Sequence, residues 1–283
     1  STQVNDRNPL WRELPALFKY IERAQSVLQR ATTQHDLLVY WPFYDVAATP
    51  FRIAIYTNID RGDAAPWFQE FPVAGVSERL TNAGYTFDYI SDKQLLNSRV
   101  SKGGLVAPSG ASYRAVVVPK TRFMPIETLR QLKAFVDAGG TVVFDESLPA
   151  SVPGLFDLSN RQRTLEDIER WLAAGRGAGD AIELLAAANV PHERSFSEKG
   201  LRAVRMELDG ERWYMVFNLG PGPIDTWVEP GASAPLYLRY DPMSGAIDEL
   251  SRNGHAIRVQ LDPERMIFIR CSSKPLSAPR FPF

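Results

Sequence analysis

The sequence is poor in the residues that form disulfides or bind transition metals. Its 283 residues include one cysteine, Cys271, and three histidines, His35, His192 and His255. An intrachain disulfide is therefore impossible, and the histidines lack the short spacing typical of a transition-metal site. Cys271 ends the apolar stretch 266–271, a position that favours a small buried hydrophobic side chain.

Long apolar runs and a strong net charge are lacking as well. No run approaches the roughly 20 apolar residues that span a bilayer, and the N-terminus has no charged-then-apolar signal pattern. The 32 basic and 33 acidic side chains leave a formal net charge of -1, which argues against a nucleic-acid partner. We therefore expect a soluble chain with neither a membrane nor a nucleic acid as partner. Because it begins with Ser1 and not with methionine, we also expect that an upstream segment has been removed.

Short apolar runs alternate with helical patterns over the first half of the chain. Runs rich in Val, Ile, Phe and Tyr predict strands at 37–41, 52–56, 86–90, 115–118 and 141–144. Helices are expected at about 66–83 and 125–138. This alternation predicts a parallel sheet with right-handed crossovers, an α/β domain comparable with flavodoxin and with class I glutamine amidotransferases.

The helical period continues at about 165–174 and 181–188 and disappears from Pro191 onward. We interpret the glycine-rich segment 175–179 between these helices as a helix–helix connection. The C-terminal part predicts a small antiparallel β-sandwich, because Asp209-Gly210 and Asn253-Gly254 have hairpin chemistry. Its strands are expected at 201–208, 212–218, 224–228, 234–240, 256–261 and 266–271.

An amphipathic helix is predicted at the N-terminus, from about Pro9 to Ala31. Its apolar residues recur at spacings of three and four. Asn8 suits the N-cap of this helix and Pro9 suits its first turn. One face is strongly apolar, so the helix requires a hydrophobic partner surface.

No motif in the chain is sufficient for catalysis by itself. The sequence contains neither a Gly-x-Ser-x-Gly elbow, nor a Gly-x-Gly-x-x-Gly fingerprint, nor a phosphate-binding loop. The amidotransferase nucleophile is excluded because Cys271 lies outside the α/β region. Asp145 and Glu146 follow a predicted parallel strand, where ligand sites of open α/β sheets lie. A capping or loop role is favoured for them, and equally for Asp88 and Asp92.

Aromatic side chains are a second possible sign of carbohydrate binding. Trp213, Tyr214 and Trp227 lie in predicted strands with one core face, so packing roles are favoured for most of them. The segment from Trp41 to Asp45 is different, because it closes a strand at the edge where a ligand crevice would lie. An aromatic plug between two domains explains this segment equally well.

Several segments together resemble the region that follows the catalytic barrel in α-L-rhamnosidases of glycoside hydrolase family 106. The similar segments follow one another in the same order: 2–11 (TQVNDRNPLW), 20–29 (YIERAQSVLQ), 36–45 (DLLVYWPFYD), 84–92 (GYTFDYISD), the stretch from 118 to 125, Pro153-Gly154 and 240–245 (YDPMSG). The resemblance covers most of the chain. Each motif is only moderately specific, and their order and spacing carry the comparison.

The resemblance implies a large exported enzyme, periplasmic or secreted, that hydrolyses terminal α-L-rhamnosyl linkages with inversion and with the assistance of calcium. It implies catalytic glutamates in an N-terminal (β/α)8 barrel upstream of this chain. Residues 1–34 would then be the last segment of that barrel, 35–190 the α/β domain and 191–283 the β-sandwich. The expected partners are the N-terminal catalytic barrel portion and a rhamnose-containing glycoside. The chain alone should be inactive, and no cofactor is evident from its residues.

The same resemblance places Asn5, Asn8 and Trp11 on the last loop of the barrel, where active sites of such barrels lie. We expect Asn5 or Asn8 to hydrogen-bond a sugar hydroxyl and Trp11 to wall the pocket. Asp45 is the fourth expected substrate-binding residue. The alternative is that Asn8 only caps the helix and Trp11 only packs.

Two other functions compete with this assignment. One is a non-catalytic carbohydrate-binding or assembly module. The other is an independent hydrolase that uses Asp145 and Glu146, which predicts activity from the purified chain alone.

Overall fold

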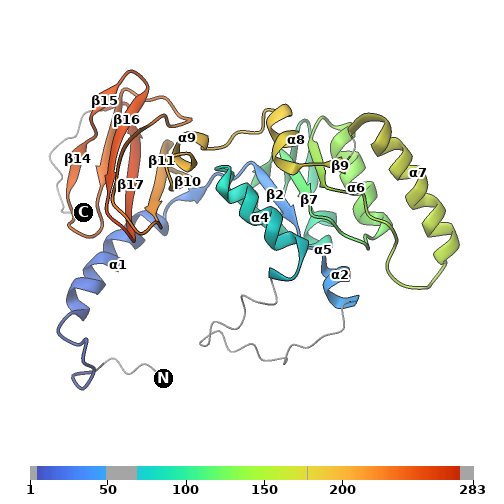
Figure 1. Cartoon of the computed structure of the whole chain (residues 1–283), viewed down its shortest axis with the longest axis horizontal. Helices are drawn as coiled ribbons and strands as arrows, with labels where there is room; N and C mark the ends of the chain where they lie inside the picture. Colours follow the sequence, from blue (N-terminus) through green and yellow to red (C-terminus); the bar gives the residue numbers. More distant parts are fainter. Residues whose placement is uncertain (1–4, 49–68, 177, 275–283) are drawn as a thin grey trace. The chain divides into compact units, whose positions relative to one another are not determined.

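The computed structural model describes residues 5–48, 69–176 and 178–274 (Figure 1). The chain divides into two compact units. His35–His192 form one, called here the α/β unit, and Ser1–Gln34 with Glu193–Phe283 form the other, called the β unit. The strand predicted at 52–56 lies outside the described residues.

A parallel sheet organises the α/β unit. Its strands are β2 (Leu37–Tyr40), β3 (Phe87–Ile90), β7 (Ala115–Val118), β8 (Thr141–Asp145) and β9 (Ala178–Gly179). Their spatial order is β3-β2-β7-β8-β9, which is 2-1-3-4-5 in chain order, an order found in doubly wound sheets. The parallel strands predicted from the sequence within the described ranges are therefore confirmed.

The glycine-rich segment after residue 174 leads from one helix to the next, as predicted. The short strand within this connection was not predicted: Ala178–Gly179 is extended and pairs with the end of β8. The Glu146 amide donates to the Gly179 carbonyl, so this short strand satisfies backbone groups that the end of β8 exposes.

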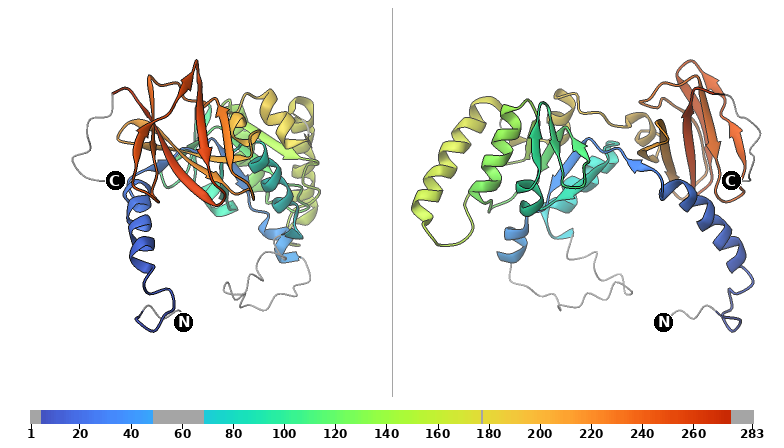
Figure 2. Two further views of the ribbon diagram at one scale, coloured as in Figure 1. Left: turned by 60° about the vertical axis from the view of Figure 1, so that its left-hand side comes forward. Right: turned by 180° about the vertical axis from the view of Figure 1, so that it is seen from behind.

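Helices cover both faces of the parallel sheet, as the continuous apolar strands predict. Leu38 and Tyr40 share a core with residues of α6 (Ile126–Asp137), whereas Leu37 and Val39 share one with residues of α4 (Pro72–Asn82). The ribbon shows helices against both faces of this sheet (Figures 1 and 2). Among its described residues this unit has the helices α2 (Phe43–Ala48), α4 (Pro72–Asn82), α5 (Asp92–Leu96), α6 (Ile126–Asp137), α7 (Leu158–Arg176) and α8 (Ala181–Ala187). A small antiparallel sheet that the sequence patterns did not predict consists of β4 (Arg99–Ser101), β5 (Gly104–Val106) and β6 (Ser112–Tyr113).

Two antiparallel sheets form the β unit. The larger has the order β1-β10-β11-β17-β13-β14 and the smaller β12-β16-β15. The strands are β1 (Thr32–Thr33), β10 (Leu201–Leu208), β11 (Glu211–Asn218), β12 (Ile224–Val228), β13 (Leu236–Tyr240), β14 (Ile247–Glu249), β15 (Arg252–Asn253), β16 (Ala256–Leu261) and β17 (Arg265–Ser272). Tyr214 and Ile269 of the larger sheet share one core with Ile257 and Val259 of the smaller. The short helix α9 (Arg194–Ser197) adds Phe196 to this core.

The N-terminal helix α1 (Leu14–Leu28) begins later than predicted. Residues 5–13 form consecutive turns instead, in which the Asn8 side chain accepts a hydrogen bond from the Leu10 amide. Asn8 therefore does not cap the helix, and Pro15, not Pro9, occupies its first turn. The physical reason is that the Asn8 side chain stabilises a local turn in competition with the helix.

The C-terminal half of α1 packs on the larger sheet of the β unit. Ala24 and Val27 are buried against Met206, Trp213 and Phe268. The Arg23 guanidinium donates to the carbonyls of Pro242 and Met243, which ties the helix to the turn after β13. The chain after α1 continues into β1, which pairs with β10. The segment predicted as the end of a barrel thus shares a unit with the two antiparallel sheets, and its barrel assignment stays a prediction.

A second face of α1 is apolar but exposed. Leu17, Phe18, Ile21 and Leu28 are between 37% and 52% exposed. At 100° per residue these four lie within about 100° of one another and beside the buried face of Ala24 and Val27. We call this set the uncovered face of α1.

We predict that Gly140→Ala destabilises the α/β unit by about 1–3 kcal/mol. A Cβ at this position would lie 2.1 Å from the ring of Phe135, a fully buried residue of α6. Gly222→Ala is the matched control, because no atom lies within 4 Å of its added Cβ. Chemical denaturation measures both variants, and equal stabilities would contradict the packing described here.

Candidate functional site

Polar side chains at the carboxyl end of the parallel sheet form the first candidate site. Asp45 lies in α2, directly after β2. Its carboxylate accepts hydrogen bonds from the Thr121 hydroxyl and the Arg122 amide, both at 2.6 Å, and from the Phe123 amide at 2.8 Å. Asp45 therefore holds the loop after β7 in place. Its expected role in substrate binding stays a prediction.

Asp92 has a similar structural role after β3. It accepts a hydrogen bond from the Tyr40 hydroxyl at 3.0 Å and one from the Thr128 hydroxyl at 2.5 Å. Burial and the neighbouring Asp92 carboxylate raise the pKa of Tyr40 far above its ordinary value, so the phenol remains a donor. Ser91 and Gln94 form a capping box at the start of α5. The loop role predicted for Asp92 agrees with these contacts.

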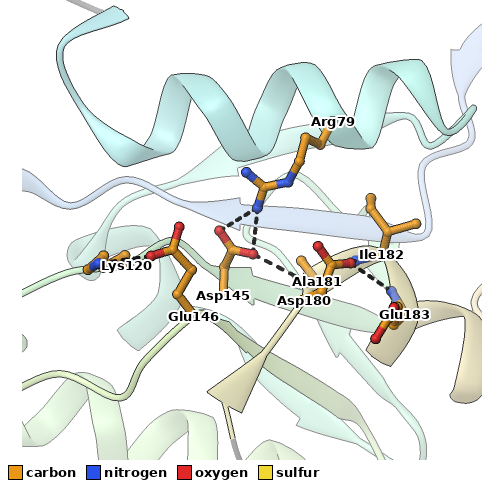
Figure 3. A network of polar contacts seen from close by, with 8 residues as sticks. All are labelled: Arg79, Lys120, Asp145, Glu146, Asp180, Ala181, Ile182 and Glu183. Atoms are coloured by element: carbon orange, nitrogen blue, oxygen red, sulfur yellow. Dashed lines mark hydrogen bonds and ion pairs between the residues drawn. The ribbon is translucent and has the colours of Figure 1, made fainter.

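Asp145 at the end of β8 forms an ion pair with Arg79 of α4 (Figure 3). The Arg79 Nη2 atom donates to both carboxylate oxygens, at 2.6 and 2.7 Å. The Ala181 amide, in the first turn of α8, donates to the same carboxylate at 3.3 Å. The Asp145 side chain is only 2% exposed, and its hydrogen bond raises the pKa of Arg79. Through these contacts the Asp145 carboxylate links two helices to the sheet.

Glu146 is the next residue and adopts a positive φ of 65°. Its carboxylate accepts a hydrogen bond from Lys120 Nζ at 2.8 Å, and this contact lowers the pKa of Glu146. A glycosidase acid requires a raised pKa. A cation contacts Asp145 as well as Glu146, which argues against the independent hydrolase that would use these two residues.

The turns before α1 bring three of the expected substrate-binding residues together. The Asn8 amide donates to the Asn5 carbonyl and the Trp11 amide to the Asn8 carbonyl, both at 2.9 Å. The Asn5 side chain accepts a hydrogen bond from the Arg7 amide. Trp11 is 44% exposed. Asn5, Asn8 and Trp11 thus lie on one short segment of the β unit, whereas Asp45 belongs to the α/β unit.

Most aromatic side chains that the sequence marked as packing residues are indeed buried. Trp213 and Tyr214 lie in hydrophobic cores on opposite faces of β11. Trp227 differs, because it is 41% exposed. At the other marked segment, the Trp41 ring meets the Tyr89 ring edge-on at 6.1 Å. In β12 the exposed positions are Asp225 and Trp227, and the burial of Val228 places Trp227 on the other face of the strand.

The residues that the structure describes include neither a cluster of metal-binding side chains nor an exposed thiol. In residues 5–48, 69–176 and 178–274 no group of three or more His, Cys, Asp or Glu side chains could hold a metal ion, and the calcium that the resemblance implies stays a prediction. Cys271 is buried, and burial raises the pKa of its thiol to about 12. Over the same ranges no helix is long and apolar enough to cross a membrane.

Comparisons with known proteins point to glycoside hydrolases. The model of glycoside hydrolase family 106, described as alpha-L-rhamnosidase, matches residues 69–182, which lie within the α/β unit. The resemblance to a portion of a family 106 α-L-rhamnosidase, which the sequence motifs indicated, is confirmed by this match.

Solved structures show how far the fold is shared. A rhamnosidase from Novosphingobium sp. PP1Y matches 99% of this chain at 16% identity with a TM-score of 0.69, and the match covers 27% of that protein. A β-galactosidase from Bacillus circulans sp. alkalophilus matches 95% of this chain at 11% identity with a TM-score of 0.53, over 46% of its own length. At these identities the matches establish the fold alone.

A curated relative gives the same indication of a larger protein. The putative β-glucuronidase of Formosa agariphila is 25% identical over 184 residues, which are 65% of this chain and 13% of the relative. This chain therefore spans only a fraction of the proteins that it resembles.

We predict that Arg79→Met lowers the free energy of unfolding by about 3 kcal/mol, because it leaves the buried Asp145 carboxylate without a cation. This loss is at the low end of the range for breaking a buried ion pair, since the Arg79 side chain is 41% exposed. The double variant with Asp145→Asn should recover most of the loss. Arg114→Met is the control: its pair with Asp36 is more exposed, and its loss should stay below about 1 kcal/mol. Equal losses for the two single variants, measured by urea denaturation, would refute the role given to Asp145.

Proposed function

We propose that this chain is the C-terminal part of a glycoside hydrolase that cleaves terminal α-L-rhamnosyl linkages with inversion. The main catalytic glutamates would lie upstream, in an N-terminal (β/α)8 barrel. The observation that carries the proposal is the match of the family 106 model to residues 69–182. Within this proposal the α/β unit is assigned to the flavodoxin and amidotransferase-like folds and the β unit to the β-sandwiches, each consistent with its strand order.

The hydrogen bonds that the carboxylates accept support the proposal that the catalytic residues lie outside this chain. A glycosidase requires one carboxylic acid and one free carboxylate flanking the scissile bond. Asp45, Asp92 and Asp145 instead accept hydrogen bonds that hold loops or helices.

The uncovered face of α1 is evidence that a large apolar surface packs against this helix in the longer protein. Several adjacent apolar side chains on one helix face indicate a binding surface. The occupant that we propose is the barrel portion, which follows from the assignment of residues 1–34 to the last segment of that barrel. Leu17 and Phe18 would then be buried in the longer protein.

The substrate pocket would receive Asn5, Asn8 and Trp11 from this chain. Amide side chains donate and accept hydrogen bonds, which suits sugar hydroxyls, and an indole supplies a flat apolar wall. For Asp45, which lies in the α/β unit, a substrate-binding role is proposed separately and without a place in this pocket. We further propose an exported, periplasmic or secreted enzyme whose calcium is bound by the longer protein.

We predict that Asn5→Ala and Trp11→Ala in the longer enzyme each lower kcat/KM for an aryl α-L-rhamnoside by about tenfold or more. Each removes a contact to the sugar and leaves the upstream glutamates in place. Arg12→Ala is the matched control from the same segment and should retain activity. Unchanged kinetics in both variants, with folding verified by circular dichroism, would remove this segment from the site.

The stereochemistry of the product tests the reaction itself. Proton NMR during hydrolysis should show β-L-rhamnose as the first sugar released, because a single displacement inverts the anomeric carbon. Initial release of α-L-rhamnose would contradict inversion.

The uncovered face has its own test. We predict that the double variant Leu17→Ser, Phe18→Ser lowers the melting temperature of the longer enzyme by several degrees, because burial of two large apolar side chains is lost. In residues 1–283 alone the change should be small, since both side chains are exposed there. Lys19→Ser with Glu22→Ser, both outside the uncovered face, is the control. An equal effect in both proteins would exclude a partner on this face.

A further inference from the structure

The outer face of the smaller sheet in the β unit carries an exposed tryptophan beside polar side chains. Trp227 of β12 pairs with Arg258 of β16, and Asp225 pairs with Gln260. Alternate residues of a strand point to opposite faces, and the neighbouring Ile257, Val259 and Leu261 fill the core. The four residues of these two pairs therefore project away from the core.

Hydrogen bonds hold the polar members of this face in place. Arg258 Nε and Nη2 donate to the two Asp225 carboxylate oxygens at 2.7 and 2.6 Å. Gln260 Nε2 donates to the same carboxylate at 3.0 Å. A side chain that is already ordered loses little conformational entropy when it binds a ligand. These three side chains thus form a preorganised hydrogen-bonding surface.

A cavity of about 270 Å³ adjoins this surface, and Gln260 contributes to both. Asp262, from the turn between β16 and β17, and Arg265, the first residue of β17, line the cavity, as do Asp241 and Met243. The Asp262 and Arg265 side chains have no hydrogen-bond or ion-pair partner within the described part of the chain. The cavity therefore offers an unused acceptor and an unused donor next to an apolar side chain.

We propose that Trp227, Arg258, Gln260 and the adjoining cavity bind a neutral glycan chain, without hydrolysing it. A sugar ring presents an apolar C–H face, which stacks on the indole, and hydroxyls that both donate and accept hydrogen bonds. One sugar lies on Trp227, with its hydroxyls toward Arg258 and Gln260. The next sugar enters the cavity.

The charges of the surface favour a neutral glycan over an acidic one. Arg258 is neutralised by Asp225, and Arg239 of the cavity is paired with Asp248. The remaining charges are those of Arg265, Asp241 and Asp262, so one negative charge is in excess. Such a surface repels uronic acids and sulfated sugars. A single exposed ring is also too small an apolar patch for a stable protein interface.

Affinity gel electrophoresis of residues 1–283 tests the inference without any measurement of hydrolysis, so it can fail independently of the proposed rhamnosidase function. The gels contain xyloglucan, arabinan, galactan or rhamnan as neutral polysaccharides, and polygalacturonate as the acidic one. We expect at least one neutral polysaccharide to retard the chain.

Variants of the tryptophan locate the site. Trp227→Ala should weaken the retardation at least about tenfold, whereas Trp227→Phe should retain part of it because a flat ring remains. Gln260→Ala should weaken it as well, since it removes a hydroxyl partner at the cavity. Phe156→Ala is the control, because Phe156 is exposed in the α/β unit.

Three results would overturn the inference. The first is the absence of retardation by every neutral polysaccharide, and the second is retardation by polygalacturonate alone. The third is unchanged binding by Trp227→Ala and Gln260→Ala. Thermal unfolding of each variant verifies that a loss of binding does not reflect a loss of fold.

Discussion

The loops at the carboxyl end of the parallel sheet require hydrogen-bond acceptors, and carboxylates at the strand ends supply them. Asp45 binds donors of the loop after β7, and Asp92 joins β2 to α6. Asp145 binds Arg79 of α4 and the first turn of α8. Buried backbone and cationic groups are costly when left unpaired. These three carboxylates therefore hold loops and helices of the unit, and none of the three is left as a free acid or base.

Helix α1 has two apolar faces, of which one is buried and one is exposed. Its C-terminal half contributes Ala24 and Val27 to a core of the β unit, and Arg23 fixes its orientation. Its uncovered face contributes apolar side chains to no described core. A helix with two apolar faces is suited to lie between two bodies. This arrangement agrees with a chain that spans 27% of a solved rhamnosidase.

Much of the fold could be predicted from the pattern of apolar residues, because burial against a core determines which positions of a strand are apolar. Val116-Val117-Val118 and Val142-Val143-Phe144 are buried on both faces of one sheet, as their continuous apolar character predicts. Hairpin dipeptides located the turns of the β unit. The predicted start of α1 was wrong because the Asn8 side chain stabilises a turn. The spacing of apolar residues does not show that such a turn competes with the helix. Strands of two or three residues, such as β9, have too little sequence to show a period.

The candidate site was less predictable, because its contacts join residues distant in sequence. Nothing in the local pattern pairs Arg79 with Asp145, or Asp45 with residues 121–123. The family resemblance could be read from ordered motifs, whereas the exposure of Trp227 could not be separated from packing until both sheets were in place. Side-chain alternation assigns two faces to a strand, and only the tertiary structure determines which of them is covered.

If the catalytic glutamates lie in a longer protein, as we propose, residues 1–283 should not hydrolyse a rhamnoside by themselves. Hydrolysis of 4-nitrophenyl α-L-rhamnopyranoside, measured for purified residues 1–283 and for the longer protein under the same conditions, tests it most directly. We expect steady release of nitrophenol by the longer protein and none above background by residues 1–283. Turnover by residues 1–283 alone, abolished by Asp145→Asn or Glu146→Gln, would contradict it.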